Sequence, residues 1–327
     1  MNLERRRGLR HLVLPALAAL VLAGCSDGAE ADGGAAEDSG GAAEESTETL
    51  TVTHAQGETE VPADPQTVAV FDMGALDTLD TLEVEVAGLP KANIPSFHDE
   101  YDSDEYTDIG TLFEPDYEAL ARLDPDLVIV GFRSAAAYPE LAERWPTVDI
   151  TFEATDFLAG HAERAEMLGE VFGKEAEVEQ HLADLEPQAE EVATVAGDVG
   201  EGLIVSTSGG EVTLYGADSR FGIIHTVLGV PEAVTDVDAA EHGEAVSFEV
   251  IRDADPDWLF VNDRDAAIGE TSGQAAEQIL DNELVASTTA WQEDQVVYLD
   301  GERWYIVMHG LSNISEMFDE VGQALGR

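Results

Sequence analysis

The sequence predicts an α/β protein of two lobes, each with a central sheet flanked by helices, joined by a single long α-helix. Three observations lead to this fold class. A helix–strand pattern occurs twice, short apolar strands alternate with helical segments, and a Glu-rich helical region lies between the two occurrences. We therefore expect an N-terminal lobe over 50–155, a connecting helix region over 156–195 and a C-terminal lobe over 196–327.

The repeated pattern begins at Glu118 and again at Glu249. Each Glu is followed, after five residues, by Asp-Pro-Asp, four apolar residues, two further residues and an arginine, Arg133 or Arg264. Asp-Pro ends a short helix because proline disfavours a helical residue before it, and the apolar residues predict a buried strand. Ligands bind at the carboxyl ends of strands in open α/β sheets, so each lobe is expected to present an arginine there.

The other elements follow from short apolar runs bounded by turn residues. In the N-terminal lobe we expect strands over 67–71 and 84–89, with a helix over 73–82 between them. In the C-terminal lobe we expect strands over 203–207 and 296–299. These elements give both lobes an α/β character.

Residues 156–195 have helical periodicity, dense glutamates and few helix breakers. Apolar side chains from Leu158 to Phe172 recur at the spacing of one helix face. A long helix between two lobes makes a stiff connection, so we expect small rocking of the lobes in place of wide closure.

Residues 1–24 are typical of a lipoprotein signal peptide. Arg5-Arg6-Arg7 precedes an apolar run from Leu12 to Leu22 that is too short to span a bilayer. Leu22-Ala23-Gly24-Cys25 resembles the bacterial lipoprotein box, in which the cysteine is lipidated and becomes the mature N-terminus. Cys25 is the only cysteine, so no disulfide can form within the chain. The arginines leave Sec and twin-arginine export both open.

Residues 25–49 are rich in Gly, Ala, Ser and acidic side chains, which is typical of a flexible tether whose charges repel one another. We therefore expect a protein anchored by lipid at Cys25 to the extracytoplasmic face of a bacterial cell membrane. Receptors, enzymes and adhesins remain as functional classes for such a protein.

The charge of the chain excludes several partners. Its 327 residues include 69 Asp and Glu against 15 Lys and Arg, for a formal net charge of −54. Binding to nucleic acid or docking on anionic lipid needs a basic surface, which this chain does not have. With 44% hydrophobic residues, the composition is nevertheless that of a folded protein with an acidic surface.

Several motifs together resemble one family. They are Val70–Asp77, Gly88–Asn93, Gly110–Asp116, Tyr215–His225, and Trp304-Tyr305 after Tyr298-Leu-Asp300. These stretches resemble the ferric-siderophore substrate-binding lipoproteins of ABC importers. In that family two α/β lobes are joined by one long helix, as in class III periplasmic binding proteins. The closest resemblance is to the branch that binds catecholate siderophores and petrobactin.

The resemblance implies a ligand site built from residues of both lobes. Arg133, Arg220 and Arg264 fall on the three pocket arginines of the family, and Tyr215 and Trp304 fall beside them. Guanidinium groups remain charged and offer forked donors to the planar oxygens of a ferric catecholate, a multiply charged anion. A site with three convergent arginines therefore favours such a ligand.

The resemblance also implies direct contact with iron and docking on a permease. His242 falls on a histidine that can bind siderophore-bound Fe(III), and Tyr305 falls on its tyrosine partner. Glu118 and Glu249 match glutamates that dock on permease arginines. Fe(III) is then part of the ligand, and no intrinsic cofactor, nucleic-acid partner or oligomer is expected.

One residue departs from the pattern of petrobactin-binding relatives. Some of these relatives have a lysine directly before the Glu-Pro pair, where this chain has Phe113. The pocket then has one charge fewer in the first lobe, which argues against petrobactin itself. Arg303, beside the proposed iron ligand, either adds a fourth cation to the pocket or points outward.

Other functional classes have less support in the sequence than a siderophore receptor. A receptor for a hydroxamate siderophore, haem or a corrinoid is the main alternative, but these ligands carry less charge and do not need three arginines. No Gly-x-Ser-x-Gly, His-Glu-x-x-His or phosphate-binding glycine loop favours an enzyme. An adhesin and a receptor for a bare metal ion have no positive support.

The acidic surface has a consequence for a receptor of anions. Its long-range field repels the ligand at low salt, whereas arginines in contact with the ligand still attract it when salt screens that field. We therefore expect faster association at high salt, and a halophilic or alkaline habitat.

Overall fold

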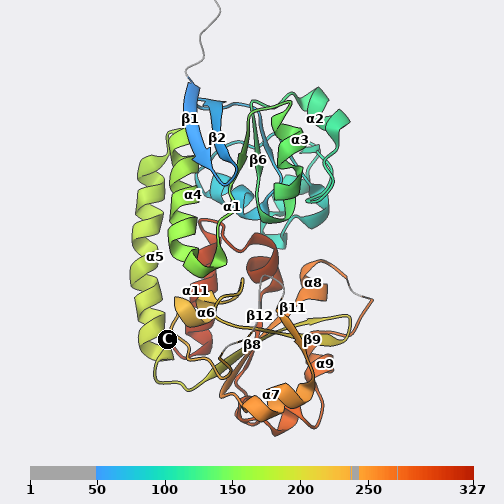
Figure 1. Cartoon of the computed structure of the whole chain (residues 1–327), viewed down its shortest axis with the longest axis vertical. Coiled ribbons are helices and arrows are strands. Elements are labelled where there is room, and N and C mark those ends of the chain that lie inside the picture. The colour runs from blue at the N-terminus through green and yellow to red at the C-terminus, as the bar shows by residue number, and fades with distance from the viewer. Residues whose placement is uncertain (1–48, 236, 238–242, 271) are drawn as a thin grey trace, which may run out of the picture. The chain divides into compact units, whose positions relative to one another are not determined.

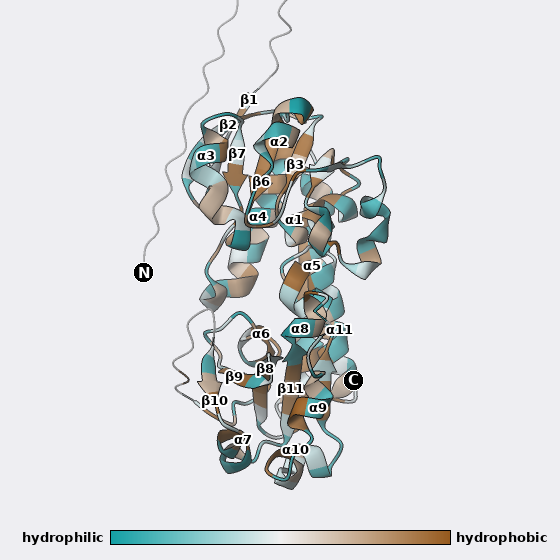
Figure 2. Ribbon diagram, turned by 90° about the vertical axis from the view of Figure 1, so that its right-hand side faces the viewer, coloured by the Kyte–Doolittle hydropathy of each residue, from teal (hydrophilic) through white to brown (hydrophobic). Residues whose placement is uncertain are grey.

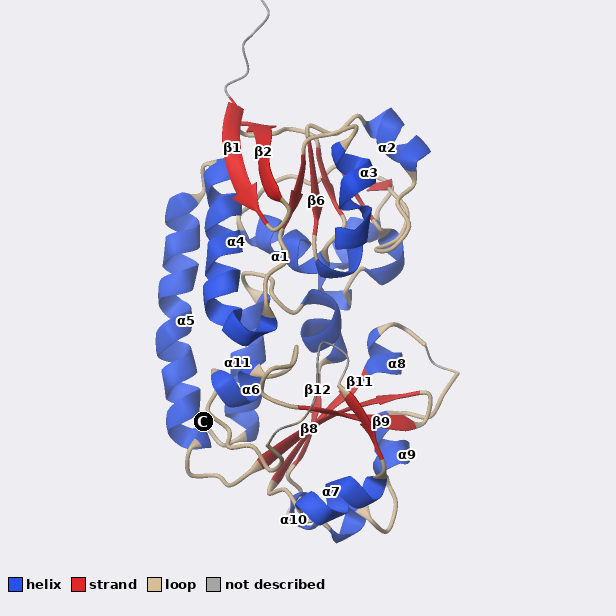
Figure 3. Cartoon of the chain, viewed as in Figure 1, coloured by secondary structure: helices blue, strands red, loops and turns tan. Residues whose placement is uncertain are grey.

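Two five-stranded sheets form the centres of two lobes in the computed structural model of the chain (Figure 1). The structure describes residues 49–235, 237, 243–270 and 272–327. Helices lie against both sheets, as Figure 3 shows, so the predicted α/β class is confirmed for the described part of the chain.

The N-terminal sheet is parallel throughout, in the order β5-β4-β3-β6-β7. Its strands are β3 (Val68–Val70), β4 (Gly88–Leu89), β5 (Thr107–Asp108), β6 (Leu127–Val130) and β7 (Thr147–Asp149). An antiparallel hairpin, β1 (Thr49–His54) and β2 (Gly57–Pro62), precedes this sheet. The central strands β3 and β6 are buried at every position, which explains their continuous apolar sequence.

The C-terminal sheet is mixed, in the order β10-β9-β8-β11-β12. Its strands are β8 (Gly202–Ser208), β9 (Glu211–Tyr215), β10 (Glu244–Val246), β11 (Trp258–Asp263) and β12 (Val296–Leu299). Strands β8, β11 and β12 are parallel, whereas β9 and β10 add an antiparallel edge.

The helical elements alternate with the strands along the chain. The α-helices are α1 (Met73–Thr81), α2 (Tyr117–Leu123), α3 (Tyr138–Ala142), α4 (Phe157–Phe172), α5 (Glu175–Ala196), α6 (Ile223–Thr226), α7 (Phe248–Ala254), α8 (Arg264–Ala267), α9 (Ala276–Leu280), α10 (Thr289–Gln292) and α11 (Asn313–Ala324). Short 3₁₀ turns are η1 (Lys91–Asn93), η2 (Ser96–Asp102), η3 (Phe132–Ala137), η4 (Ala154–Asp156) and η5 (Val285–Ser287), and η6 (Glu302–Val307) is a π-helix. Among the described residues, none of these helices is long and apolar enough to cross a membrane.

The repeated sequence pattern forms the same structure in both lobes. Helix α2 leads to β6 and α7 leads to β11, and each helix ends at an aspartate with a left-handed backbone, Asp124 or Asp255. The last aspartate of each Asp-Pro-Asp accepts hydrogen bonds from the backbone just before a neighbouring strand. Asp126 receives the N–H of Thr67 at 2.9 Å, and Asp257 receives that of Glu201 at 2.8 Å.

The connecting region consists of two helices where the sequence predicted one over 156–195. Helix α4 ends at Gly173, which has a left-handed backbone, and α5 runs back past it (Figure 1). Residues of α4 such as Leu168 belong to the core of the N-terminal lobe. The long connecting helix is α5 alone, whose second half, from Leu185, packs into the core of the C-terminal lobe. The prediction missed Gly173 as a helix C-cap.

Two of the predicted strands are shorter than expected. The strand predicted over 84–89 is confirmed only at Gly88–Leu89, and that over 67–71 becomes Val68–Val70. The helix predicted over 73–82 is confirmed as α1, and it begins after Asp72, whose carboxylate accepts the N–H of Ala75 at 2.9 Å.

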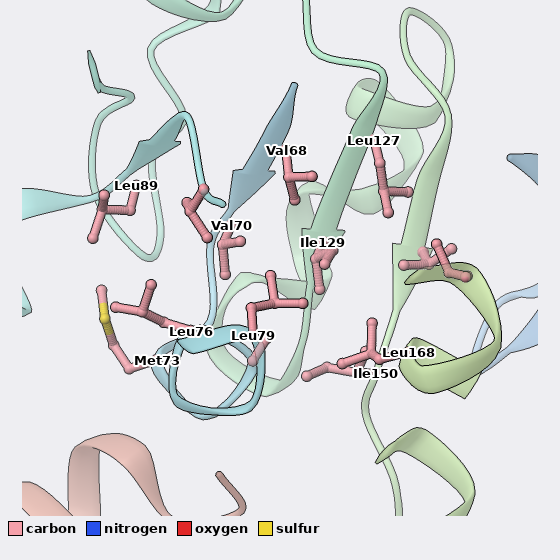
Figure 4. Close-up of a cluster of buried hydrophobic side chains, with 14 of the residues drawn as sticks. Val68, Val70, Met73, Leu76, Leu79, Leu89, Leu127, Ile129, Ile150 and Leu168 are labelled. Carbon is pink, nitrogen blue, oxygen red and sulfur yellow. The ribbon is translucent and has the colours of Figure 1, made fainter. Parts of the chain in front are cut away.

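The cores of the lobes lie between the sheets and their helices. Figure 4 shows Val70 and Ile129 of the N-terminal sheet above Leu76 and Leu79 of α1, with Leu168 of α4 beside them. In the C-terminal lobe, apolar side chains of β8 and β11 pack against α5, α6 and α11 on one side and against α7, α9 and α10 on the other. Figure 2 shows the same strands in brown, the colour of hydrophobic residues.

Candidate functional site

A cavity of about 540 Å³ lies between the two lobes, in the size range of small-molecule sites. Its lining residues are Phe113, Phe132, Arg133, Thr151, Phe152, Glu153, Ala154, Thr155 and Phe157 from the first half of the chain, and Asp218, Arg220, Tyr305, Met308 and His309 from the second. Phe132 and Arg133 follow β6 at its carboxyl end, where the repeat predicted a ligand site.

Two bulky residues in the cavity wall have a left-handed backbone. Phe132 has φ 47° and Met308 has φ 51°, and both line the cavity. The other non-glycine residues with positive φ, in the described part of the chain, are all Asp or Glu. Such backbone strain in bulky residues is held in place by the surrounding structure and occurs preferentially at ligand sites.

Arg133 connects the two lobes through main-chain oxygens. Its guanidinium donates to the carbonyl oxygens of Tyr305 and Ile306 in η6, and lies 4.8 Å from the centre of the Tyr305 ring. The turn before it requires Gly131, because a Cβ there would lie 2.6 Å from a side-chain carbon of Ile150. The N–H of Phe132 donates to the Thr151 hydroxyl at 2.7 Å and fixes this turn.

Arg220 also lines the cavity, from the loop after β9. Its Nη2 contacts the Met308 sulfur at 3.1 Å, and its guanidinium is 4.7 Å from the centre of the Tyr305 ring. Its Nε is buried and has no hydrogen-bond partner among the described residues. Burial and the charge of Arg133 both lower the pKa of Arg220, so this cation lacks part of its solvation.

Arg264 begins α8 at the end of β11, as the repeat predicted. Its Nε donates to the Tyr305 hydroxyl at 3.0 Å, and its Nη1 donates to the Ser208 hydroxyl at 3.1 Å. Asp265 lies 3.6 Å from Nη1, and 42% of the Arg264 side chain is exposed. Arg264 is therefore at the edge of the site, where it orients Tyr305.

Tyr305 is the residue on which the three arginines converge. It belongs to the π-helix η6, in which the N–H of Met308 donates to the carbonyl oxygen of Arg303, five residues earlier. Burial raises the pKa of Tyr305, but the hydrogen bond from Arg264 and the charges of Arg133, Arg220 and Arg264 outweigh burial and lower it. The phenol of Tyr305 therefore loses its proton more readily than the phenol of an ordinary tyrosine.

The positive charge of this cluster is not neutralised within the site. Among the described residues, no carboxylate lies within 4.0 Å of a nitrogen of Arg133 or Arg220, although Asp218 also lines the cavity. Buried charges without a partner are costly, and an anion that enters the cavity would remove this cost. Two arginines, Arg133 and Arg220, and two carboxylates, Glu153 and Asp218, line the cavity, and the arginines have no ion pair with these carboxylates.

Aromatic side chains form one wall of the cavity, and most of them had no signal in the sequence. Phe152 makes edge-to-face contacts with Phe132 at 5.2 Å and with Phe157 at 5.5 Å. Phe113, which the sequence singled out, is 69% exposed and lines the cavity at its opening. Planar ligand rings can stack on such a wall.

A buried polar pair supports this wall. His309 stacks on Phe132 with ring centres 4.5 Å apart, and its Nε2 lies 3.1 Å from a carboxylate oxygen of Asp72. Burial raises the pKa of Asp72, but His309 and the N–H of Ala75 outweigh burial and lower it. Burial lowers the pKa of nearby His161 to about 3, so His161 is neutral. No local sequence pattern indicates this pairing, because Asp72 and His309 come from distant segments.

Two residues predicted to contact the ligand do not line the cavity. The Trp304 side chain is fully buried in the core of the C-terminal lobe and donates from its indole N–H to Glu320 at 2.6 Å. Tyr305 lines the cavity whereas its neighbour Trp304 does not, so the position of Trp304 gives no support to its predicted ligand role. Tyr215 is also buried and packs edge-to-face on Phe221, behind Arg220.

The contacts of Arg303 decide whether it adds a fourth cation to the cavity or points away from it. Its guanidinium lies 4.5 Å from the centre of the Phe97 ring and pairs with Asp300 at 3.6 Å and Glu316 at 3.7 Å. It does not line the cavity. Arg303 therefore does not add a fourth cation to the site.

The remaining predicted residues lie away from the cavity or outside the described residues. Glu118 and Glu249 are exposed on the first turns of the equivalent helices α2 and α7, one in each lobe (Figure 1). His242, Cys25, the signal peptide and residues 25–48 of the predicted tether lie outside the described residues.

Two α/β lobes, one connecting helix and a cavity at strand ends define a solute-binding protein. Residues 68–303 match the family described as Periplasmic binding protein, and the chain belongs to this family. The comparisons therefore agree with the two-lobed α/β fold that the repeat predicted and with the class of protein that the motifs resemble.

Individual relatives are siderophore-binding proteins. The petrobactin-binding protein YclQ of Bacillus subtilis is 38% identical over 85% of this chain and 89% of its own length. Its crystal structure has a TM-score of 0.83, with 86% of this chain and 99% of that one covered. The ferric-anguibactin-binding protein FatB of Vibrio anguillarum is 31% identical over 83% of this chain and 86% of its own length. The crystal structure of the catecholate-siderophore-binding protein VctP of Vibrio cholerae has a TM-score of 0.77 at 33% identity, with 84% of this chain and 99% of that one covered.

Proposed function

We propose that this protein is the extracytoplasmic receptor of an ABC importer, and that it captures an anionic ferric siderophore of the catecholate type between its lobes. The observation that carries this proposal is the convergence of three guanidinium groups on the Tyr305 ring, at 4.7 to 5.8 Å from its centre. Arg133 and Arg220 have no carboxylate within ion-pair distance among the described residues.

The chemistry of the cavity suits a planar anion. Guanidinium groups donate in fixed forks to catecholate oxygens, and each charge-assisted hydrogen bond contributes about 1.5–3 kcal/mol. The aromatic wall formed by Phe132, Phe152 and Phe157 offers stacking surfaces to the catechol rings. A neutral hydroxamate complex could use the wall, but it would leave the arginines without a counter-charge.

For a siderophore that leaves two iron positions free, we propose that Tyr305 and His242 bind the metal. The lowered pKa of Tyr305 supports a phenolate, which is the form that binds Fe(III). Iron binding by Tyr305 produces a charge-transfer absorption band. If that band persists unchanged in Tyr305→Phe, this part of the proposal is wrong.

Delivery to the membrane completes the proposed function. We propose that Cys25 carries the lipid anchor and that residues 25–49 act as a tether. Glu118 and Glu249, exposed in separate lobes, are the proposed contacts with arginines of the permease. The partners are then a ferric siderophore, the permease and its ATPase subunits.

The test is a pair of titrations followed by quenching of the four tryptophans. We expect the full chain to bind a ferric tris-catecholate at least tenfold more tightly than a ferric trihydroxamate, because only the catecholate carries the charge that the arginines need. Arg220→Gln should weaken catecholate binding about 10- to 100-fold, the equivalent of one or two charge-assisted hydrogen bonds.

Arg144→Gln is the matched control. Arg144 also lies over a tyrosine ring, 4.7 Å from the centre of Tyr117, but on the exposed surface of the N-terminal lobe. This variant should bind like the wild type. Tighter binding of the hydroxamate, or equal losses for Arg144→Gln and Arg220→Gln, would contradict the proposal.

A further inference from the structure

A group of metal-binding side chains lies in the N-terminal lobe, apart from the cavity between the lobes. Ligand atoms of Asp80, His98 and Glu100 all lie within 4.8 Å of one another. Asp80 comes from the last turn of α1, whereas His98 and Glu100 come from η2. None of the three is among the residues that line the cavity between the lobes.

His98 points an unused lone pair at this group. The residue is 5% exposed, and its Nε2 lies 3.2 Å from a carboxylate oxygen of Asp77. A carboxylate accepts hydrogen bonds, so Nε2 carries a proton. In the neutral ring Nδ1 then has a free lone pair, whereas in the charged ring it carries an N–H that faces Asp80 at 3.9 Å. Nδ1 is buried and has no hydrogen-bond partner among the described residues. A buried polar atom without a partner needs an explanation.

Asp80 offers an oxygen to the same point. Its Oδ1 accepts the hydroxyl proton of Tyr101 at 2.7 Å, while its Oδ2 lies 3.9 Å from Nδ1 of His98. That distance is too long for a hydrogen bond. Two ligands about 2.0–2.2 Å from one tetrahedral ion lie about 3.4 Å apart, so these two atoms would have to approach by about 0.5 Å to share an ion.

The residues around these ligands resemble the outer layer of a metal site. Metal-binding histidines typically donate their second ring N–H to a carboxylate, which fixes the tautomer and the orientation of the ring. Asp77 does this for His98, and Tyr101 holds the far oxygen of Asp80. Glu100 is exposed and can supply the third ligand, which leaves further positions open to water.

The surroundings attract cations. A hollow of about 410 Å³ adjoins the group and is lined by Asp80, Glu83, Glu85 and Glu105. Its acidic wall raises the local concentration of cations. The C-terminal end of α1, where Asp80 lies, adds the negative end of a helix dipole.

We propose that Asp80, His98 and Glu100 bind a divalent first-row transition metal ion such as Zn²⁺. An imidazole nitrogen together with carboxylate oxygens suits Zn²⁺ and its neighbours better than Mg²⁺ or Ca²⁺, which prefer oxygen ligands alone. This inference concerns a site separate from the siderophore cavity and does not rest on the proposed function.

A bound ion would also stabilise the contact between the lobes. Asp77, which orients His98, accepts the N–H groups of Ser312 and Asn313 at 3.0 and 3.2 Å, at the start of α11. An ion that fixes His98 therefore holds Asp77 in the position that α11 needs. We expect Zn²⁺ to raise the melting temperature of the wild type.

The experiment is a calorimetric titration of the full chain with Zn²⁺. We expect His98→Gln to bind one equivalent fewer than the wild type, and Glu100→Gln to bind that equivalent about tenfold more weakly. Glu100 is exposed, so its variant tests the site even if His98→Gln is destabilised. Co²⁺ in place of Zn²⁺ should give a visible absorption band that is lost in His98→Gln.

His181→Gln is the matched control, because His181 is a partly exposed histidine on the acidic helix α5. It should keep the stoichiometry and affinity of the wild type. Unchanged Zn²⁺ binding in both His98→Gln and Glu100→Gln would overturn the proposal. Displacement of Zn²⁺ by an equal concentration of Ca²⁺ would also overturn it, since a simple acidic patch would then explain the binding.

Discussion

The two lobes build the same helix–strand unit and then use its arginine differently. In the N-terminal lobe, Phe132 turns into a left-handed backbone after β6, and Arg133 enters the cavity without a carboxylate partner among the described residues. In the C-terminal lobe, Asp263 caps α8, and Arg264 remains 42% exposed beside Asp265. A sequence repeat thus reproduces a position in the fold without reproducing its electrostatic environment.

The different surroundings of Arg133 and Arg264 indicate different roles: one arginine faces the ligand, and the other orients Tyr305. A ligand anion would be the main counter-charge of Arg133, whereas Asp265 and water already compensate Arg264 in part. Arg264 instead donates to the Tyr305 hydroxyl at 3.0 Å. We therefore assign charge neutralisation mainly to Arg133 and Arg220, and the orientation of Tyr305 to Arg264.

The largest expected effect is on ligand affinity. Arg133→Gln should weaken binding of a ferric tris-catecholate about 100-fold, and Arg264→Gln only about tenfold, because exposed and partly paired charges contribute less. Tryptophan quenching measures both dissociation constants, and the melting temperature of each variant checks its fold. Equal losses, or a larger loss for Arg264→Gln, would contradict the division of roles between the two arginines.

The second effect is on the titration of Tyr305. The folded-state pKa of this phenol is lower than its ordinary value of about 10. Its contribution to stability therefore grows as pH rises through the folded-state pKa, and it is absent at lower pH. The difference in tyrosinate absorbance between wild type and Tyr305→Phe measures this pKa. Arg264→Gln should raise the pKa by removing a hydrogen bond, and a pKa unchanged by this substitution would contradict the orienting role.

The smallest effect concerns the helix ends that precede β6 and β11. Asp124 and Asp255 both have left-handed backbones, with φ 51° and 43°. Among the described residues, the side chain of Asp255 accepts the N–H of Thr289 at 2.8 Å, whereas that of Asp124 makes no hydrogen bond. Asp124→Gly should stabilise the protein by about 0.5–1 kcal/mol, because glycine adopts this backbone without steric cost. Asp255→Gly should give no gain, since it loses a hydrogen bond worth about 1 kcal/mol. Urea denaturation of both variants measures the difference.

The sequence predicted the parts of the fold that local patterns determine. The Asp-Pro-Asp repeat located α2, β6, α7 and β11, because proline ends a helix and a continuous apolar run is buried as a strand. The same repeat placed Arg133 and Arg264 at strand ends. The break at Gly173 was also readable, since a glycine after a helical run is a common C-cap.

The parts that were missed depend on distant contacts or on irregular backbone. The π-helix η6 has no simple periodicity, so the sequence did not show that Tyr305 lines the cavity while its neighbour Trp304 is buried in the core. Phe132 and Met308 have positive φ only because the surrounding structure holds them there. The pairing of Asp72 with His309 joins the two halves of the chain and has no local signature.

Helix α5 has a mechanical consequence for the importer. It is anchored at both ends by buried side chains, Val178 beside α4 and Val192 in the C-terminal core, and Gln188 clamps it to Ser315 and Asp319 of α11. Pro187 lies inside α5 and weakens the helix at that point, but the contacts of Gln188 beside it oppose bending there, so we expect the empty and loaded receptors to have nearly the same outline. A permease that docks on Glu118 and Glu249 would then encounter almost the same arrangement of the lobes in the empty and the loaded receptor. Such a permease would have to distinguish the loaded from the empty receptor by a small change in the spacing or stiffness of these two contacts. It would also have to separate the lobes itself in order to release the ligand.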